Sequence, residues 1–178
     1  TTLRELAKEL GVSHNLLNVR FGTKEDLWRR AVDARVVRIA PPVFEAFDAS
    51  GLEEEARLRE LVHRFCRWAA ENGEFAALSY VEGRRATWRI DYIVAAYLRH
   101  FKEKLEALLG SVAEQRPVHP ITTSAFMAML VQGVGFYFAS QPMLDRLGVG
   151  EELEAGHIEA QIDMFADFIL AALLPRQP

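Results

Sequence analysis

Hydrophobic residues recur at intervals of three and four along nearly the whole chain, with hardly any of the alternation typical of strands. This spacing predicts an all-α protein. Several helices should begin at capping boxes, in which a side-chain oxygen accepts from the amide three residues on and the acidic partner reaches back. The three pairs with that spacing are Thr2 with Glu5, Thr23 with Asp26, and Ser50 with Glu53. The helices expected from them cover residues 3–10, 24–40 and 52–71.

The second half of the chain predicts longer helices. Pro41 and Pro42 should end the helix that begins near Lys24 and leave a short helix through VFEAFD. An amphipathic helix over residues 90–109 should end at Gly110 in a left-handed cap. The helices expected beyond it cover residues 121–140, buried on nearly every side, and 151–173, with two apolar sides. Helices with more than one apolar face favour a partner subunit.

No charged residue occurs from Pro120 to Leu144, which raises the alternative of a membrane span of roughly 20 residues. Threonines, serines and Gln132 dilute this segment, and no basic cluster flanks it, so a buried helix is favoured.

The opening TTLRELAKEL shows no signal-peptide pattern. Cys66 is the sole cysteine, which excludes an intrachain disulfide. We therefore expect a cytoplasmic protein that does not contact membranes.

Charge is distributed unevenly along the chain. Residues 1–35 contain seven Lys and Arg against five Asp and Glu, a net charge of +2, whereas the whole chain carries −4, so the remainder carries −6. A basic start on an acidic body is a weak indication of a polyanionic partner at one end of the molecule.

The clearest motif is ELAKELGVSHNLLNVRFGTKEDLW, residues 5–28. Ala7 is small where two helices cross, Gly11 suits a positive-φ turn, and Leu17 can seat the second helix on the first. Such a helix-turn-helix presents one face of its second helix to a DNA major groove. With Leu17 inward, rotations of about 100° per residue aim Asn15 and Val19 outward. Asparagine pairs with adenine and an apolar group contacts the thymine methyl, so this face suits A·T pairs.

Two helices joined by a glycine turn also occur in ordinary bundles, so the surrounding residues are needed for a more specific interpretation. The run LRELAKELGVSHNLLNVRFGTKEDLWRRAVDA resembles the DNA-binding region of the tetracycline-repressor (TetR) family of regulators. The residues that carry the resemblance are Leu6, Ala7, Gly11, Val12, Ser13, Leu17, Phe21, Thr23, Lys24, Glu25 and Leu27. The rest of the chain resembles the family only in being an all-helical body.

The resemblance implies a helix-turn-helix domain over residues 1–35 and a ligand-binding and dimerisation domain over residues 36–178. It implies phosphate contacts at Thr2 and Lys24 and a cap at Ser13. The side chains expected to face the groove are His14, Asn15, Leu16, Asn18, Val19 and Arg20. The family commonly has Tyr in place of Asn18 and an aromatic residue or His in place of Arg20, which leaves the operator sequence open. Members also carry a helix before the position of Thr1, and we expect this chain to lack it.

The body would then enclose a small apolar or aromatic effector and pair with a second copy, as the resemblance implies. The ligand-binding candidates are Phe65, Trp68, Phe75, Tyr80, Trp88, Tyr92, Tyr97, Met127, Gln132, Phe136 and Tyr137, with His63 and Cys66 as further polar groups. The dimer-interface candidates are Gly133, Gly135, Ile158, Ile162, Phe165, Ile169 and Leu173. Each aromatic residue taken singly also fits an ordinary core position.

No catalytic residue, metal ligand or cofactor is predicted. The serines lack a nucleophile-elbow context, no glycine-rich phosphate loop occurs, and the histidines do not show metal-ligand spacing. The favoured function is a homodimeric, effector-responsive DNA-binding regulator, most simply a repressor on a palindromic operator. The alternatives are a helical ligand-binding or scaffold protein without DNA binding, and a small helical enzyme or membrane-associated module.

Overall fold

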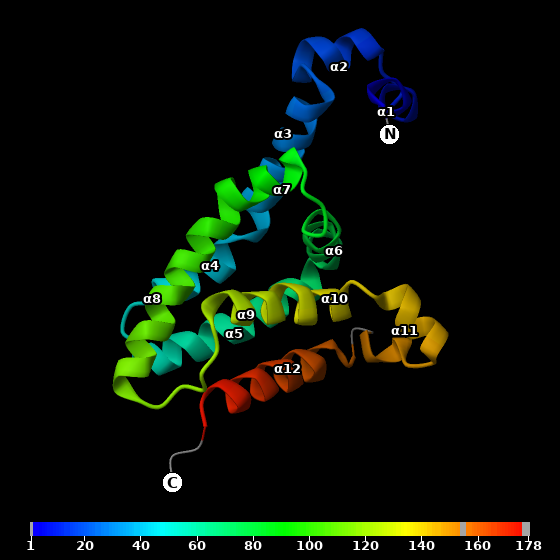
Figure 1. Cartoon of the computed structure of the whole chain (residues 1–178). Helices are drawn as coiled ribbons and strands as arrows, with labels where there is room; N and C mark the ends of the chain where they lie inside the picture. Colours follow the sequence, from blue (N-terminus) through cyan, green and yellow to red (C-terminus); the bar gives the residue numbers. More distant parts are fainter. Residues whose placement is uncertain (1, 154–155, 176–178) are drawn as a thin grey trace. The chain divides into compact units, whose positions relative to one another are not determined.

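The computed structural model describes residues 2–153 and 156–175, and within those ranges every regular element is helical (Figure 1). The predicted all-α class is therefore confirmed. The chain divides into two compact units, Thr1–Pro41 and Pro42–Pro178, which are described separately below. The expected domain boundary at residue 35 falls within a continuous helix, because that helix extends to Ile39.

The N-terminal unit contains α1 (Leu3–Glu9), α2 (His14–Phe21) and α3 (Lys24–Ile39). Both capping boxes predicted here are present. The Glu5 amide donates to Thr2 Oγ1 at 3.2 Å, and the Thr2 amide donates to the Glu5 carboxylate at 2.7 Å. The same exchange joins Thr23 and Asp26, at 3.1 and 3.0 Å. Local hydrogen bonds thus fix where α1 and α3 begin.

The second unit contains the remaining helices, and two of its long helices include a π-helical segment. Its elements are α4 (Pro41–Phe47), α5 (Glu54–Glu71), α6 (Gly73–Glu82), α7 (Trp88–Ile93), the π-helix η1 (Val94–Leu98), α8 (Arg99–Gln115), α9 (Thr123–Ala128), the π-helix η2 (Met129–Val134), α10 (Gly135–Phe138), α11 (Gln141–Leu147), the 3₁₀-helix η3 (Gly150–Leu153) and α12 (Ile158–Leu173). The short helix after Pro41 agrees with the prediction.

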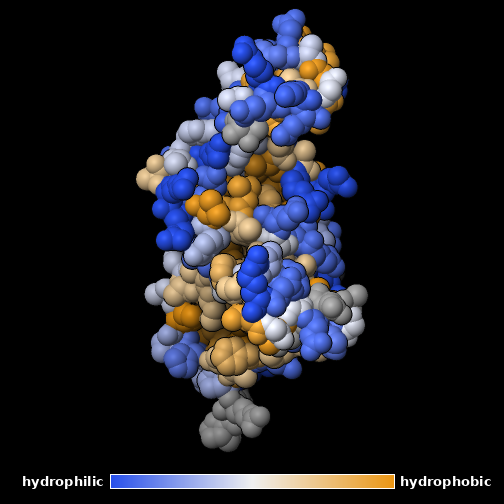
Figure 2. All heavy atoms as spheres, turned by 90° about the vertical axis from the view of Figure 1, so that its right-hand side faces the viewer, coloured by the Kyte–Doolittle hydropathy of each residue, from blue (hydrophilic) through white to orange (hydrophobic). Residues whose placement is uncertain are grey.

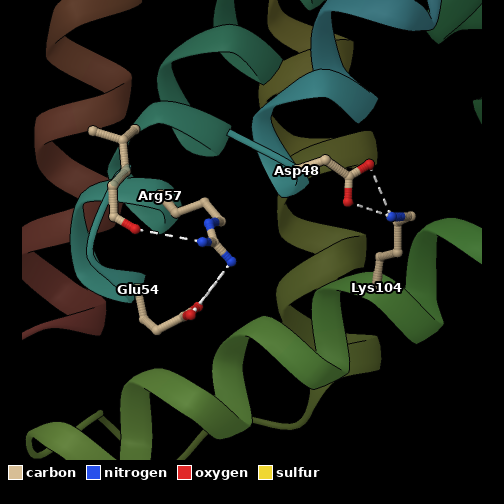
Figure 3. A network of polar contacts seen from close by, with 5 residues as sticks. Asp48, Glu54, Arg57 and Lys104 are labelled. Atoms are coloured by element: carbon tan, nitrogen blue, oxygen red, sulfur yellow. Dashed lines mark hydrogen bonds and ion pairs between the residues drawn. The ribbon is translucent and has the colours of Figure 1, made fainter. Parts of the chain in front are cut away.

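The predicted capping box at Ser50 is wrong, since Glu53 occupies the N-cap of α5 without a side-chain bond. The chain instead turns at Gly51, whose φ is +83°. Arg57 holds the end of this turn by donating to the Leu52 carbonyl at 3.4 Å and to Glu54 at 3.3 Å (Figure 3). The Arg57 side chain, which belongs to α5, therefore holds this helix start in place of the expected Ser50 cap.

Two predicted helix ends also differ. Gly110 is not in a left-handed conformation, because α8 continues through it to Gln115. The last helix begins at Ile158 rather than near residue 151, and the 3₁₀-helix η3 precedes it. Residues 154 and 155, which the prediction also placed in that helix, lie outside the described residues.

The core of the second unit is organised on one face of α5. Its buried side chains are Leu58, Leu61, Val62, Phe65, Cys66 and Ala69. α12 runs alongside α5 (Figure 1), and Arg67 donates to both carboxylate oxygens of Glu159 at 2.6 and 2.8 Å across the two helices. Full burial of each large apolar side chain contributes about 1.5–3 kcal/mol, so this face is the main stabilising contact of the unit.

The uncharged segment forms α9, η2 and α10, but it is not buried on nearly every side as predicted. One stripe is buried, whereas Gln132 and Phe136 are exposed. Within the described residues no single helix is long and apolar enough to cross a membrane. Thr123–Phe138 and Gln141–Leu147 pass such a test of length and composition only as a pair, bent by 61°.

Arg116 joins three parts of the second unit at the end of α8. Its guanidinium donates to Glu55 in the first turn of α5 and to the Pro175 carbonyl at 2.7 Å, with the Arg116 side chain only 14% exposed. The hydrogen bonds from Arg116 and then Arg59 hold the pKa of Glu55 below its ordinary value of 4.5. Because the folded pKa is lowered, this stabilisation is complete above pH 4.5 and is lost as the pH falls through the folded value.

We expect Glu55→Gln to lower the free energy of unfolding by about 1–3 kcal/mol at neutral pH, since a charge-assisted hydrogen bond is lost. The difference from the unmodified chain should shrink as the pH falls below 4.5. Denaturant unfolding at several pH values measures both. Glu106→Gln, which removes an exposed pair with Lys102, is the matched control and should change stability by less than about 0.5 kcal/mol. Equal effects of the two changes would contradict the assignment.

Candidate nucleic-acid interface

A glycine turn sets the angle between α1 and α2. Gly11 has φ +65°, the Gly11 amide donates to the Lys8 carbonyl at 3.3 Å, and the Val12 amide donates to the Ala7 carbonyl at 3.0 Å. These two bonds form a Schellman motif, which requires the left-handed conformation that glycine adopts without strain. Ala7 is 2% exposed, so its small side chain lies where the helices pack, as predicted.

The second helix is held at both ends and on its inner face. Ser13 caps α2 by accepting from the Leu16 amide at 3.1 Å. Gly22 ends the helix with φ +78°, and a Cβ there would approach the Asp26 carboxylate to 2.8 Å. Leu17 is 5% exposed, which confirms the inward direction on which the predicted orientation of α2 depends.

The opposite side of α2 is exposed. Val19 is 78% and Leu16 51% exposed, so their apolar side chains are available for contact with a partner. His14, Asn15, Asn18 and Arg20 are also exposed. All six residues predicted to face the groove are thus exposed on one helix, although their contacts with DNA stay a prediction.

The two asparagines of α2 differ in what they already contact. The Asn18 amide nitrogen lies 3.2 Å from His14 Nδ1 and donates to it when that nitrogen is unprotonated. Asn15 makes no side-chain hydrogen bond within the described ranges. Its amide donor and acceptor are therefore both available for an adenine edge, the pairing that asparagine favours in the major groove.

The two predicted phosphate contacts lie at the starts of the flanking helices. The exposed Thr2 hydroxyl is the N-cap of α1, and the exposed Lys24 side chain begins α3. Hydrogen bonding from the Thr2 backbone lowers the pKa of Glu5, so an anionic carboxylate occupies part of the first of these sites. Lys24 is the more favourable of the two for binding a phosphate.

The predicted ligand residues do not form a single cluster. Phe65, Trp68 and Phe75 follow one another with ring centroids 5.3 and 6.1 Å apart. A second group pairs Tyr80 with Phe136 at 5.3 Å. Tyr92 and Tyr97 form a further pair with ring centroids 6.3 Å apart. Tyr137 packs on Phe165, and Met127 packs against the core. Gln132 is exposed, and Trp88 is half-buried with the Arg89 guanidinium over its ring.

Two polar groups near the first aromatic group differ in chemistry. Trp68 Nε1 is buried and lacks a hydrogen-bond partner within the described part of the chain, which leaves a buried donor that a water molecule or a ligand would have to satisfy. Cys66 is fully buried, and desolvation raises the pKa of its thiol to about 12, which makes it a packing residue. His63 instead lies on the α5–α12 surface, 3.8 Å from Asp163.

Several dimer-interface predictions need correction. Ile162, Ile169 and Leu173 are 2–3% exposed and pack into the core of their own chain, so they are not available to a second copy. Gly135 is buried where a Cβ would come within 3.0 Å of Ala76, so it serves contact between α10 and α6. Of the remaining positions, Phe165 packs on Tyr137 and Phe138. Ile158 packs against the core, and Gly133 is exposed.

The outer side of α12 exposes apolar side chains that the dimer-interface prediction did not include. Phe168 is 70% and Met164 49% exposed, on the second apolar side that the sequence shows for this helix. A separate exposed group lies on α11, where Leu147 is 66% and Met143 45% exposed. Figure 2 views the molecule from the side on which α11 lies in Figure 1 and shows hydrophobic residues at the surface between hydrophilic ones.

Within the described residues no group of three or more His, Cys, Asp or Glu side chains is arranged to hold a metal ion. The N-terminal unit instead offers an amide, apolar side chains and cations on exposed helix surfaces. These groups suit hydrogen bonding to base edges and electrostatic contact with phosphates.

Leu17→Ala and Val19→Ala form a matched pair in one helix. We expect Leu17→Ala to destabilise the N-terminal unit by about 2–5 kcal/mol because it leaves a cavity, whereas Val19→Ala should change its stability by less than about 0.5 kcal/mol. Amide hydrogen exchange of α1 and α2 measures the difference. Equal protection in the two variants would show that α2 is not seated by Leu17.

Comparison with known proteins agrees with this geometry. Residues 1–31 match the family model described as bacterial regulatory proteins, tetR family. No curated protein matches the chain. The matched segment contains α1, the Gly11 turn, α2 and the first half of α3. The N-terminal unit is thus a DNA-binding helix-turn-helix of a transcriptional regulator, and the match supports membership of the tetR family.

Proposed function

We propose that the protein is a homodimeric repressor that releases a palindromic operator when a small apolar or aromatic effector binds its second unit. The observation that carries this proposal is the exposure of Asn15 and Val19 on the outer surface of α2. Ser13 caps the start of this helix, and Leu17 is buried on its inner face. A short helix with an exposed apolar and amide face on a tetR-type segment is suited to the major groove.

On DNA, Asn15 and Val19 would contact base edges at the centre of α2. Asparagine and valine together favour A·T pairs, through adenine and the thymine methyl. Leu16, Asn18, His14 and Arg20 would lie toward the groove walls. Lys24 and Thr2 would contact phosphates, which positions the helix without reading sequence.

Dimerisation is proposed through the outer side of α12. Phe168 and Met164 expose apolar surface there, and a second copy related by a twofold axis would cover the same residues on both subunits. Two copies of α2 held about 34–36 Å apart would then meet successive major grooves. A palindromic operator follows from that symmetry.

The effector is proposed to contact the aromatic residues around α5 and α6. Trp68 Nε1 supplies a buried donor without a partner in the described part of the chain, next to Phe65 and Phe75. An aromatic molecule with a hydrogen-bond acceptor would satisfy it. Such an effector changes DNA binding only by the difference between its affinities for the DNA-bound and released states.

Selection of bound sequences from a random duplex pool, at two salt concentrations, tests DNA binding directly. We expect a palindrome with half-sites about one helical turn apart and affinity that falls steeply with salt. Recovery of no sequence would contradict the proposal and favour a helical ligand-binding or scaffold protein instead.

Asn15→Ala and Lys24→Ala should affect DNA binding differently. Asn15→Ala should relax base preference at one position of each half-site, at a cost of about 1–3 kcal/mol, whereas Lys24→Ala should weaken binding to all sequences and lower the salt slope. Titration of each variant against the selected operator and a scrambled duplex measures this. An Asn15→Ala variant with unchanged preference would contradict the proposed orientation of α2.

Phe168→Glu tests the dimer surface. We expect this change to give monomers and to abolish operator binding at the same protein concentration, because it places a charge in an apolar contact. Leu147→Glu, at the similarly exposed apolar group of α11, is the matched control and should leave the dimer intact. Sedimentation of both variants decides the question, and a monomeric Leu147→Glu would place the interface on α11.

A further inference from the structure

A groove of about 340 Å³ lies where the end of α8 meets the segment leading into α9. Its volume is at the lower end of the range for small-molecule sites. The residues used below are Glu106, Leu109, Gly110, Ala113, His119 and Ile121, all of which line it. None of the ligand residues predicted from the sequence lines this groove, and it belongs entirely to the second unit.

The groove is fixed by hydrogen bonds that join its surroundings to other parts of the second unit. The His119 amide donates to the Leu173 carbonyl at 2.8 Å, which joins the α8–α9 segment to the end of α12. Arg116, three residues earlier in the chain, is held by Glu55 and the Pro175 carbonyl. A ligand would therefore meet a surface that is formed before it binds.

Gly110 leaves space in the wall of the groove. It lies inside α8, where glycine is disfavoured relative to nearly every other residue. Its φ is not positive, and a Cβ added to it would meet no atom within 4 Å. Neither backbone conformation nor close packing thus requires glycine here, but a side chain at this position would occupy the groove.

The charge of the lining favours a cation. Glu106 is the one Asp, Glu, Lys or Arg among the described residues that line the groove. The Lys102 ammonium, 2.7 Å away, forms with Glu106 an exposed i,i+4 pair of the weak kind that a ligand can replace. The last turn of α8 contains no basic residue, but Arg116 follows it at the C-cap. The Arg116 cation offsets part of the negative potential of the α8 carbonyl end, so the charge argument depends on Glu106. The opposing helix start, at α9, already has its Ala125 amide capped by Thr122 at 3.1 Å.

We propose that this groove binds a small amphipathic amine. The ammonium group would contact the Glu106 carboxylate, and the apolar body would lie over Gly110 against Leu109, Ala113 and Ile121. This site is independent of the proposed effector contacts around Trp68 and of the DNA-binding unit.

Titration of the full-length chain with benzylamine, followed by NMR shifts of the Gly110 and His119 amides, tests the site. We expect saturable shifts with benzylamine and none with benzoate, which has the same ring and the opposite charge. Gly110→Leu should abolish the shifts at His119 while retaining the helical circular dichroism spectrum, because leucine favours a helix and fills the groove. Glu106→Gln should weaken benzylamine binding about two- to five-fold.

Glu103→Gln is the matched control, since Glu103 is an exposed carboxylate on α8 that does not line the groove. It should leave benzylamine binding unchanged. The proposal is overturned if benzylamine causes no saturable shifts, if benzoate binds equally well, or if Gly110→Leu binds as the unmodified chain does. Shifts that depend on protein concentration alone would assign the groove to a second copy and would also overturn it.

Discussion

The buried face of α5 is the constraint on which the second unit depends. Leu58, Leu61 and Val62 are fully buried along it, and α12, α8, η2 and α10 all pack against this one helix. Because interiors are close-packed, a change of volume on this face has to be accommodated by several helices at once. Each of these helices turns one apolar face toward α5. Where a helix has a second apolar side, as α12 has at Phe168, that side is left at the surface.

The π-helical segment η2 follows from the same constraint. Phe126, Leu130, Val134 and Phe138 are all buried and are spaced four residues apart. In an α-helix each step of four residues rotates about 40° beyond a full turn, so this stripe would drift away from α5 over its length. A segment with wider turns reduces the drift and keeps all four side chains inward. The underwinding is therefore a packing requirement, encoded in a spacing that is regular but not that of an ideal α-helix.

Local features were predictable from the sequence, whereas the choice between competing apolar faces was not. The boxes at Thr2 and Thr23 and the direction of Leu17 depend on residues within a few positions of one another. Ser50 had the same spacing, but a glycine turn and Arg57 fixed that helix start differently. For α12 both sides were apolar, and only packing on α5, distant in sequence, decided that Ile162 and Ile169 face inward. A helix end was predicted at Gly110 because glycine is common there and no neighbouring residue indicated that α8 continues to Gln115.

The N-terminal unit has a smaller core, so the position of α2 depends on hydrogen bonds as well as on buried area. Ala7 and Leu17 are the buried residues of α1 and α2, and the Gly11 turn and the Ser13 cap supply the rest of the constraint on α2. On its outer face His14 already contacts the Asn18 amide, which a base edge would have to displace. Asn15 requires no such exchange. On the proposed interface Asn15 would therefore gain hydrogen bonds to a base at a lower cost than Asn18. The family commonly has Tyr in place of Asn18, so this departure from the family pattern would lie beside the centre of the proposed base-contacting surface.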